Sequence, residues 1–197
     1  DVYKRQQLWY GDLIYADANG DGNYGDTNDM NFTGTSTQPR YNFGLNLSVA
    51  YKGFDFYMLW AGSAGFDLYW NHSSYNGTRT ENGFGISQRV ADNHYFYNPE
   101  NPSDSRTNIT AKYPRITDQT QRDNGTSSVF WKYKGDYVKL KNIQIGYTIP
   151  VKWTRKFMVE KLRFYFSGEN LLTITSYPGL DPEMGTSITY PLTRQFA

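Results

Sequence analysis

The sequence predicts an all-β fold, specifically a segment of an antiparallel transmembrane β-barrel with long extracellular loops. First, aromatic residues make up 18% of the chain although its mean hydropathy is −0.71. Second, several segments alternate apolar and polar residues with a period of two, which is typical of strands with one apolar face. Third, short connections alternate with long ones, as they do between the periplasmic and extracellular sides of outer-membrane barrels.

Composition alone leaves two classes of protein open. A barrel that is apolar only toward lipid combines many aromatic residues with a hydrophilic mean. A secreted, soluble glycan-binding β-sandwich with a calcium loop does so too. The connection lengths favour the barrel, because a structureless region as long as Asn71–Ser128 is improbable in a compact soluble domain. A barrel wall exposes Leu45, Leu47 and Val49 to lipid, whereas a sandwich buries them.

Charge and cysteine content exclude other classes. The net charge of +1 gives no strong field that would attract nucleic acid. The absence of cysteine excludes disulfides and thiolate metal sites. Residues 1–6 (DVYKRQ) resemble translated sequencing-adapter read-through and are expected to be an artefact. Residues 7–197 are then expected to form one part of a barrel that breaks off within a final strand.

The first half of the chain contains the clearest strand. Gln7–Tyr15 is expected to be a strand, followed by a loop rich in Gly, Asn and Asp over Ala16–Arg40. Tyr41–Tyr51 alternates throughout, has Tyr at both ends, and matches the ~9–11 residues that cross a bilayer when tilted. Lys52-Gly53 is predicted to be a tight turn, and Phe54–Gly62 to run back as the next strand.

The second half continues the same pattern. Lys139 and Lys141 share the alternation of Ile143 and Ile145, so they are expected on the apolar face, in a part of the strand that rises above the membrane. The expected elements are a continuation of the preceding strand over Gly65–Trp70, the outer loop Asn71–Ser128, a strand over Asp136–Pro150, a basic connection of one or two helical turns over Val151–Val159, a strand over Leu162–Glu169, a loop over Leu171–Thr189 and a last strand from Tyr190.

Several segments, in order, resemble the SusC/RagA family of TonB-dependent transporters. They are GDLIYADANGDG (Gly11–Gly22), the strand pair Arg40–Gly62, GDYVKLKNIQIGYTIP (Gly135–Pro150), LRFYFSGENLLTITSYPGLDPE (Leu162–Glu183) and YPLTRQFA (Tyr190–Ala197). The positions that carry the signature are Gly146, Tyr147, Pro150, Asn170, Leu171, Thr173, Tyr177, Gly179, Asp181, Pro182 and Glu183.

The resemblance implies a role in nutrient import. It implies that this chain supplies about the last six strands of a barrel of about 22 strands in the bacterial outer membrane, surrounded by lipid. It further implies import of oligosaccharides or peptides, driven by TonB through a part of the protein outside this chain, beneath a SusD-like lipoprotein lid. Glu169, Asp181 and Glu183 then serve loop structure or lid contact rather than glycoside hydrolysis, and no enzymatic activity or nucleic-acid partner is expected.

The loop after the first predicted strand is a candidate calcium site. Asp17, Asn19 and Asp21 followed by Gly22 form D-x-N-x-D-G, the opening half of an EF-hand-like calcium loop, whose oxygen atoms can converge on a hard cation. Asp26 and Asp29 are the other candidate ligands, although Asp29 falls one position late and is not the usual Glu. The alternative is an Asx-rich turn that satisfies its own backbone. No other cofactor is expected.

Aromatic residues in or beside the long loop are candidate contacts for substrate or partner. Their rings could stack on sugars, or they could serve loop packing, the interfacial belt or lid contact. The candidates are Trp70, Tyr75, Tyr95, Tyr97 and Trp131.

Overall fold

The computed structural model describes residues 8–70, 86–116, 124, 128–186 and 192–197. The chain divides into two compact units. The sheet unit comprises Thr35–Leu68 and Tyr133–Ala197, and the loop unit comprises Asp1–Gly34 and Tyr69–Lys132. No helix in the described part of the chain has the length and apolar character needed to cross a membrane.

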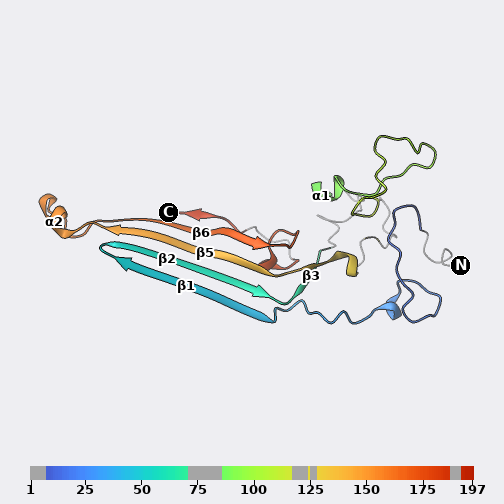
Figure 1. Cartoon of the computed structure of the whole chain (residues 1–197), viewed down its shortest axis with the longest axis horizontal. Helices are drawn as coiled ribbons and strands as arrows, with labels where there is room; N and C mark the ends of the chain where they lie inside the picture. The colour runs from blue at the N-terminus through green and yellow to red at the C-terminus, as the bar shows by residue number, and fades with distance from the viewer. Residues whose placement is uncertain (1–7, 71–85, 117–123, 125–127, 187–191) are drawn as a thin grey trace. The chain divides into compact units, whose positions relative to one another are not determined.

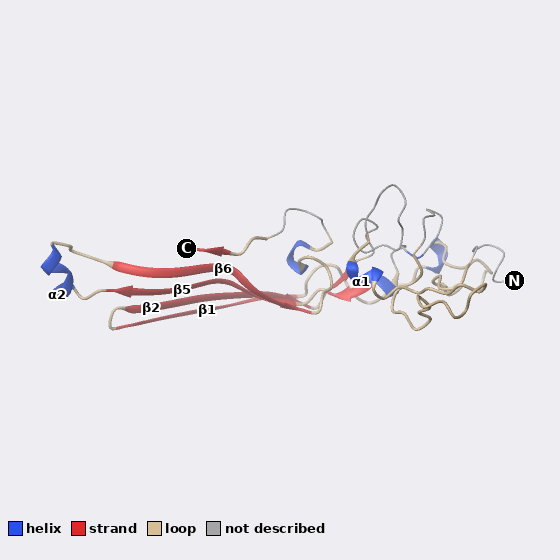
Figure 2. Cartoon of the chain, turned by 90° about the horizontal axis from the view of Figure 1, so that it is seen from above, coloured by secondary structure: helices blue, strands red, loops and turns tan. Residues whose placement is uncertain are grey.

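The sheet unit is an antiparallel five-stranded sheet in the order β1-β2-β5-β6-β7 (Figures 1 and 2). Its strands are β1 (Tyr41–Tyr51), β2 (Phe54–Ala64), β5 (Tyr137–Thr148), β6 (Arg163–Thr175) and β7 (Gln195–Phe196). A two-stranded sheet pairs β3 (Asp67–Tyr69) with β4 (Lys132–Lys134). The helices are short: α1 (Gln88–Ala91), α2 (Val151–Thr154) and the 3-10 turns η2 (Thr27–Asp29), η5 (Val129–Trp131), η6 (Arg155–Phe157) and η7 (Pro182–Met184).

The β1–β2 hairpin follows the sequence prediction closely. β1 has the predicted bounds, and β2 begins at the predicted residue and runs two residues further. Lys52 and Gly53 both have positive φ, at 47° and 89°, and Tyr51 pairs with Phe54. Two positive φ values define the turn type that suits the twist of a two-residue hairpin. The short connection is therefore confirmed.

One face of the sheet is apolar across all its strands. Directly opposed residues of antiparallel strands share a face, so the pairing register shows which residues belong to the apolar face. They include Phe43, Leu45, Leu47 and Val49 of β1, Phe54, Phe56, Met58 and Trp60 of β2, Val138, Leu140, Ile143, Ile145 and Tyr147 of β5, Phe164, Phe166, Leu172 and Ile174 of β6, and Phe196 of β7.

This face stays uncovered within the described part of the chain. Leu45, Leu47 and Val49 are 58%, 40% and 53% exposed. The exposure that a barrel wall predicts is therefore observed, whereas a sandwich would bury the three side chains. The opposite, polar face carries Asn42, Ser63 and Tyr137, which are joined by hydrogen bonds through the Ser63 hydroxyl.

A bulge in β5 corrects the predicted placement of Lys139. Trp60 pairs with Leu140 but Leu59 pairs with Asn142, so Lys141 is an extra residue in β5. The extra residue reverses the alternation, as β-bulges do. Lys139 consequently pairs with Ala61 on the polar face, and the prediction that Lys139 and Lys141 belong to the apolar face was wrong.

β6 continues past the predicted end at Glu169. Leu140 pairs with Leu172 while Asn142 pairs with Glu169, so β6 bulges around Asn170, whose φ is 53°. Beyond the bulge, Leu172 and Ile174 extend the apolar face. The loop predicted over Leu171–Thr189 therefore begins only after Thr175, because the bulge hides the continuing alternation from a period-two count.

Asn170 tests this bulge directly. Valine is expected to destabilise the strand by about 1–2 kcal/mol, because a β-branched residue is strained at positive φ. Glycine, which adopts positive φ freely, should be tolerated. The measurement is the temperature at which the folded transporter loses its heat-resistant electrophoretic mobility. Equal effects of Asn170→Val and Asn170→Gly would contradict the assigned conformation.

Three other predicted elements differ from the structure. Residues 8–15 form no strand, because their polar groups are bound within the loop unit: Leu13 N donates to Asn124 Oδ1, and Gly11 O accepts from Arg115 N. The chain turns at Gly65, where φ is 78°, so 67–69 pair with β4 instead of prolonging β2. The last strand is short, and the predicted start at Tyr190, like residues 1–6, lies outside the described residues.

Candidate functional site

The loop after β6, Ser176–Gly185, folds back onto the polar face of the sheet; it is called the signature loop below. Asp181 precedes η7, and its Oδ1 accepts a hydrogen bond from Glu183 N at 2.9 Å. Pro182 occupies the first turn, where its missing N–H costs nothing, and its side chain is buried. This local geometry places the carboxylates of Asp181 and Glu183 beside each other.

Lys139 holds both carboxylates. Its Nζ donates to Asp181 Oδ1 and Oδ2 at 2.7 and 2.6 Å and to Glu183 Oε2 at 2.8 Å. Lys141 Nζ donates to both oxygens of Glu183 at 2.6 Å. The Lys139 residue is only 1% exposed. Two cations balance two anions, so the buried ammonium group is fully paired, as a buried charge must be.

The cluster changes the acidity of Glu183. Partial burial raises its pKa, but hydrogen bonds and charge from Lys139 and Lys141 outweigh that effect and hold the pKa below its ordinary value. A depressed carboxyl pKa stabilises the folded state above the unfolded pKa, and the contribution is lost as pH falls through the folded value. The signature loop should therefore be held most firmly at neutral pH.

The side chain of Tyr177 is buried inside the signature loop. Its ring is buried, its hydroxyl donates to Gly185 O at 3.3 Å, and burial raises its pKa to about 12. A Cβ at Gly179 would lie 2.2 Å from the Tyr177 ring, so glycine is required there. The Thr175 hydroxyl accepts from Tyr177 N and donates to Asp136 O, which joins the start of the loop to β5.

Gly146, a signature residue of β5, leaves room for a second ion pair on the polar face of the sheet. Arg163 donates to Asp55 at 2.5 Å between Nη2 and Oδ2, and this pair crosses β5 over Gly146. A Cβ at Gly146 would approach the Asp55 carboxylate to 2.5 Å, so a larger residue would displace the pair. On the other face, the Tyr147 ring lies 4.3 Å from that of Phe54.

The remaining signature residues lie after β5 and within β6. Pro150 precedes the first turn of α2. Asn170 forms the β6 bulge, Leu171 packs against Gly168, and Thr173 pairs with Lys139. The structure thus brings Asp181 and Glu183 to Lys139, with Tyr177 in the same loop, whereas Gly146 and Tyr147 lie further along β5 and Pro150 follows that strand.

The loop unit has a core of its own. Arg115 binds both oxygens of Asp12, at 2.5 and 3.2 Å. Asn124 donates to Asp12 Oδ1 at 2.9 Å and accepts from Leu13 N at 2.7 Å. Trp131, fully buried, donates from Nε1 to Asn124 O at 2.6 Å and stacks on Tyr113. These hydrogen bonds therefore connect segments that are separated by more than a hundred residues in the sequence.

Most of the candidate aromatic contacts serve this packing. Trp70 and Trp131 are buried, so a ligand could reach them only after the loops rearrange. Tyr95 lies against Gly11, where a Cβ would come within 2.2 Å of its ring, and Tyr97 meets Tyr10 edge to face at 5.5 Å. Tyr75 lies outside the described residues. Contact with substrate or partner stays a prediction for these side chains.

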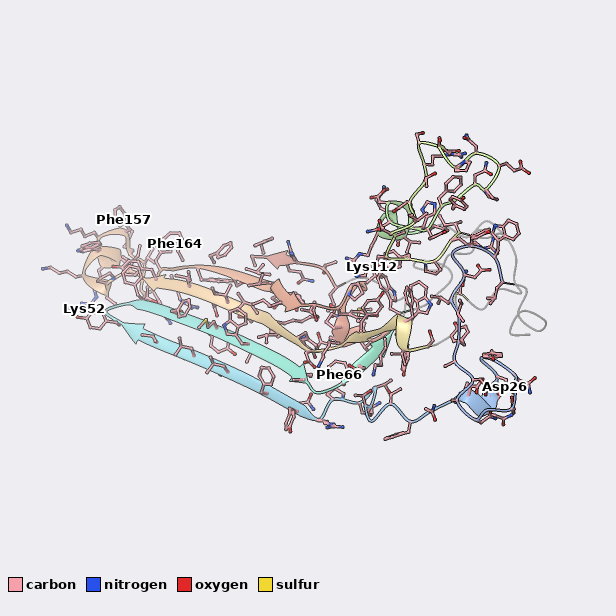
Figure 3. The ribbon with its side chains drawn as sticks, turned by 45° about the vertical axis from the view of Figure 1, so that its right-hand side comes forward. Asp26, Lys52, Phe66, Lys112, Phe157 and Phe164 are labelled. Atoms are coloured by element: carbon pink, nitrogen blue, oxygen red, sulfur yellow. The ribbon has the colours of Figure 1, made fainter. Side chains whose placement is uncertain are left out.

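The acidic loop is closed by its own side chains. Asp17 accepts hydrogen bonds from the backbone N–H groups of Gly20, Asp21 and Gly22, and Asn19 Oδ1 accepts from Asp21 N. Asp29 accepts from Ala18 N and Gly25 N, and Asp26, labelled in Figure 3, caps η2. Among the residues that the structure describes, no three His, Cys, Asp or Glu side chains are grouped to hold a metal ion. Calcium binding stays a prediction.

Known proteins are similar to this chain in sequence. The chain is 32% identical over 173 residues to the TonB-dependent receptor P3 of Formosa agariphila. The aligned region covers 88% of this chain and 15% of that protein. It is 29% identical over 178 residues to the TonB-dependent receptor P39 of the same organism, covering 89% and 16%. No protein-family model matches the chain.

Solved structures agree on the fold. The RagAB peptide importer in its open-open state superposes with a TM-score of 0.62 at 22% identity, over 94% of this chain and 20% of that chain. The RagAB peptide transporter superposes with a TM-score of 0.60 at 22% identity, over all of this chain and 20% of the other.

Fold and relatives together define a class: the chain is similar to one part of TonB-dependent receptors. The predicted resemblance to SusC/RagA-type transporters is confirmed as a resemblance: the sequence relatives are TonB-dependent receptors, and RagAB shares the fold. It spans about a sixth of the length of the curated relatives it matches. These relatives are named as receptors and importers, not as enzymes.

Sequence reasoning missed Lys139 and Lys141 as members of the site. The signal was present as the two lysines of VKLK in a strand that continues with Ile143 and Ile145, together with the two acids of LDPE. Pairing them required knowledge of the bulge in β5, which moves Lys139 to the polar face.

Proposed function

We propose that this chain forms the C-terminal part of the barrel wall of an outer-membrane transporter that imports oligosaccharides or peptides. The observation that carries the proposal is the uncovered apolar face of the five-stranded sheet opposite a polar face that carries ion pairs, one of them through the buried Lys139. In an outer-membrane barrel the apolar side meets lipid and the polar side meets the lumen. The resemblance to TonB-dependent receptors supports this assignment.

The proposed mechanism involves partners on both sides of the membrane. TonB supplies energy through a part of the protein outside this chain, and a SusD-like lipoprotein closes over the extracellular side. The loop unit and the signature loop belong to that extracellular side, and the short connections Lys52-Gly53 and Val151–Val159 to the periplasmic side. Import of peptides by the RagAB complex supports peptides as one cargo class.

Gene deletion tests the proposal. In the bacterium that encodes the transporter, loss of the gene should abolish growth on one class of oligosaccharide or peptide as sole nutrient. The intact gene should restore growth, but only when TonB is functional, and the protein should fractionate with the outer membrane. Unchanged uptake of every oligosaccharide and peptide tested would contradict the proposal, as would recovery of the protein as a secreted, soluble species.

Calcium remains a proposal for the loop Asp17–Asp29. Each carboxylate oxygen offers about two acceptor sites, so the backbone bonds to Asp17 leave sites for a cation. Calcium would require the carboxylates to draw closer together. The proposal predicts that chelation increases proteolysis within residues 16–30 and that Asp17→Asn removes this dependence, while Asp104→Asn, in another loop, does not. Equal proteolysis with and without calcium would establish the self-satisfied turn.

A further inference from the structure

The connection between β5 and β6 exposes apolar side chains that nothing in the described part of the chain covers. It comprises α2, η6 and the residues that follow, Val151–Val159. Trp153, Phe157 and Met158 are 60%, 77% and 95% exposed. A connection that served only as a solvated turn would not need such side chains, and grouped exposed apolar residues mark a contact surface.

The backbone of this connection is fully organised. Thr154 is buried, and its carbonyl oxygen accepts from Val159 N at 3.2 Å. Met158 ends η6 with a φ of 59° and donates its N–H to Arg155 O at 3.1 Å. Ile149 N donates to Leu162 O at 2.9 Å, which closes the base of the connection. The exposed side chains are thus presented from an ordered turn.

Positive charge surrounds the apolar side chains. Four cations, Lys152, Arg155, Lys156 and Lys161, are exposed, and one acid, Glu160, lies among them. None of the four forms a salt bridge within the described part of the chain. Val151, Arg155, Met158, Val159 and Glu160 line a hollow of about 360 Å³. An anionic head group beside an apolar chain matches this combination.

The connection lies at the end of the sheet unit where the apolar face carries aromatic residues. Phe157 lies at the same end of the sheet unit as Phe164 and Lys52, as Figure 3 shows. Phe54 and Phe164 are exposed on the apolar face at that end, beside Tyr147. Aromatic residues at the end of an apolar wall followed by lysine and arginine reproduce the order of layers from hydrocarbon to head group.

From this arrangement we propose that Val151–Lys161 is a docking surface for anionic phospholipid of the periplasmic leaflet, with Lys152, Arg155 and Lys156 toward the phosphate groups and Trp153, Phe157 and Met158 toward the acyl chains. The inference rests on the proposed membrane location of the sheet. The four cations against one acid favour an anionic lipid over a zwitterionic one, because juxtamembrane lysine and arginine attract anionic lipid.

Lipid retention by the whole transporter tests the charge part of this surface. The transporter is purified from nanodiscs of phosphatidylethanolamine with phosphatidylglycerol, and retained lipid is measured by native mass spectrometry. Lys152→Gln with Arg155→Gln should lower retained phosphatidylglycerol by about tenfold or more. The matched control, Arg89→Gln with Lys112→Gln, removes the same charge from the loop unit and should change nothing. Equal retention of phosphatidylglycerol by both variants would overturn the proposal. Retention of phosphatidylethanolamine equal to that of phosphatidylglycerol by the unmodified transporter would overturn it too.

Depth measurement tests the apolar part. A nitroxide on Met158→Cys should collide with oxygen and be protected from a water-soluble nickel complex, whereas one on Glu100→Cys should be accessible to nickel. If Met158 is as accessible to nickel as Glu100 while a label at Leu47 lies in lipid, this inference fails and the proposed function stands. If the Leu47 label is also in water, the proposed function fails as well.

Discussion

Replacement of Lys139 by methionine is expected to release the signature loop from the sheet, at a cost of about 3–5 kcal/mol. Lys139 is the buried cation between Asp181 and Glu183, and without it two carboxylates face each other with only Lys141 beside them. Buried pairs contribute little net stability, but removal of one partner leaves uncompensated charge. Hydrogen–deuterium exchange of residues 176–186 in the folded transporter measures the release.

Lys141→Met is the matched control for Lys139→Met. It lies on the same strand and contacts Glu183, but it is partly exposed, so its loss should cost only about 0–1 kcal/mol. Adding Asp181→Asn and Glu183→Gln to Lys139→Met should recover part of the protection, because the unpaired charges disappear. In the unmodified protein, protection should fall as pH drops below the ordinary pKa of glutamate. Equal exchange in the two single variants would contradict the role of Lys139.

Truncation of Trp131 to alanine should disrupt the loop unit, at a cost of about 3–5 kcal/mol. The side chain is fully buried, contacts the rings of Phe130 and Tyr113, and holds Asn124 through its indole N–H. Its loss leaves a cavity and an unpaired carbonyl oxygen. Limited proteolysis within residues 86–116 should increase, while the heat-resistant mobility of the barrel is unchanged.

Val129→Ala provides the comparison for Trp131→Ala. Val129 belongs to the same turn, η5, but is exposed, so its truncation should change stability by less than about 0.5 kcal/mol. If residues 86–116 resist proteolysis equally in Trp131→Ala and Val129→Ala, the loop unit does not depend on the buried indole.

Regular alternation made parts of the sheet predictable. Both ends of β1 could be predicted to the exact residue, because its alternation is unbroken and the Lys52-Gly53 turn fixes the hairpin. β5 and β6 could be located, but their faces could not be assigned throughout, because each contains a bulge. Asn170 is among the residue types that tolerate positive φ, yet in sequence it reads equally well as the start of a loop.

The loop unit was beyond prediction from the sequence. Its stability depends on contacts such as Asp12 with Arg115 and Trp131 with Asn124. Such contacts join irregular segments that carry no periodic signal, so the sequence predicts a strand over Gln7–Tyr15 where the structure has none over residues 8–15, and it does not reveal the packing role of Trp131. The signature loop was recognisable by resemblance, but its anchor Lys139 followed only from the register of the sheet.

Collision accessibility along β1 tests the central claim most directly. Single nitroxide labels at Asn42 to Ala50 of the reconstituted transporter should alternate with a period of two. Phe43, Leu45, Leu47 and Val49 should be accessible to oxygen and protected from nickel, and the residues between them should not meet lipid. A strand on which the apolar positions are accessible to nickel, or on which no alternation appears, would contradict the account of this chain as a membrane-spanning wall.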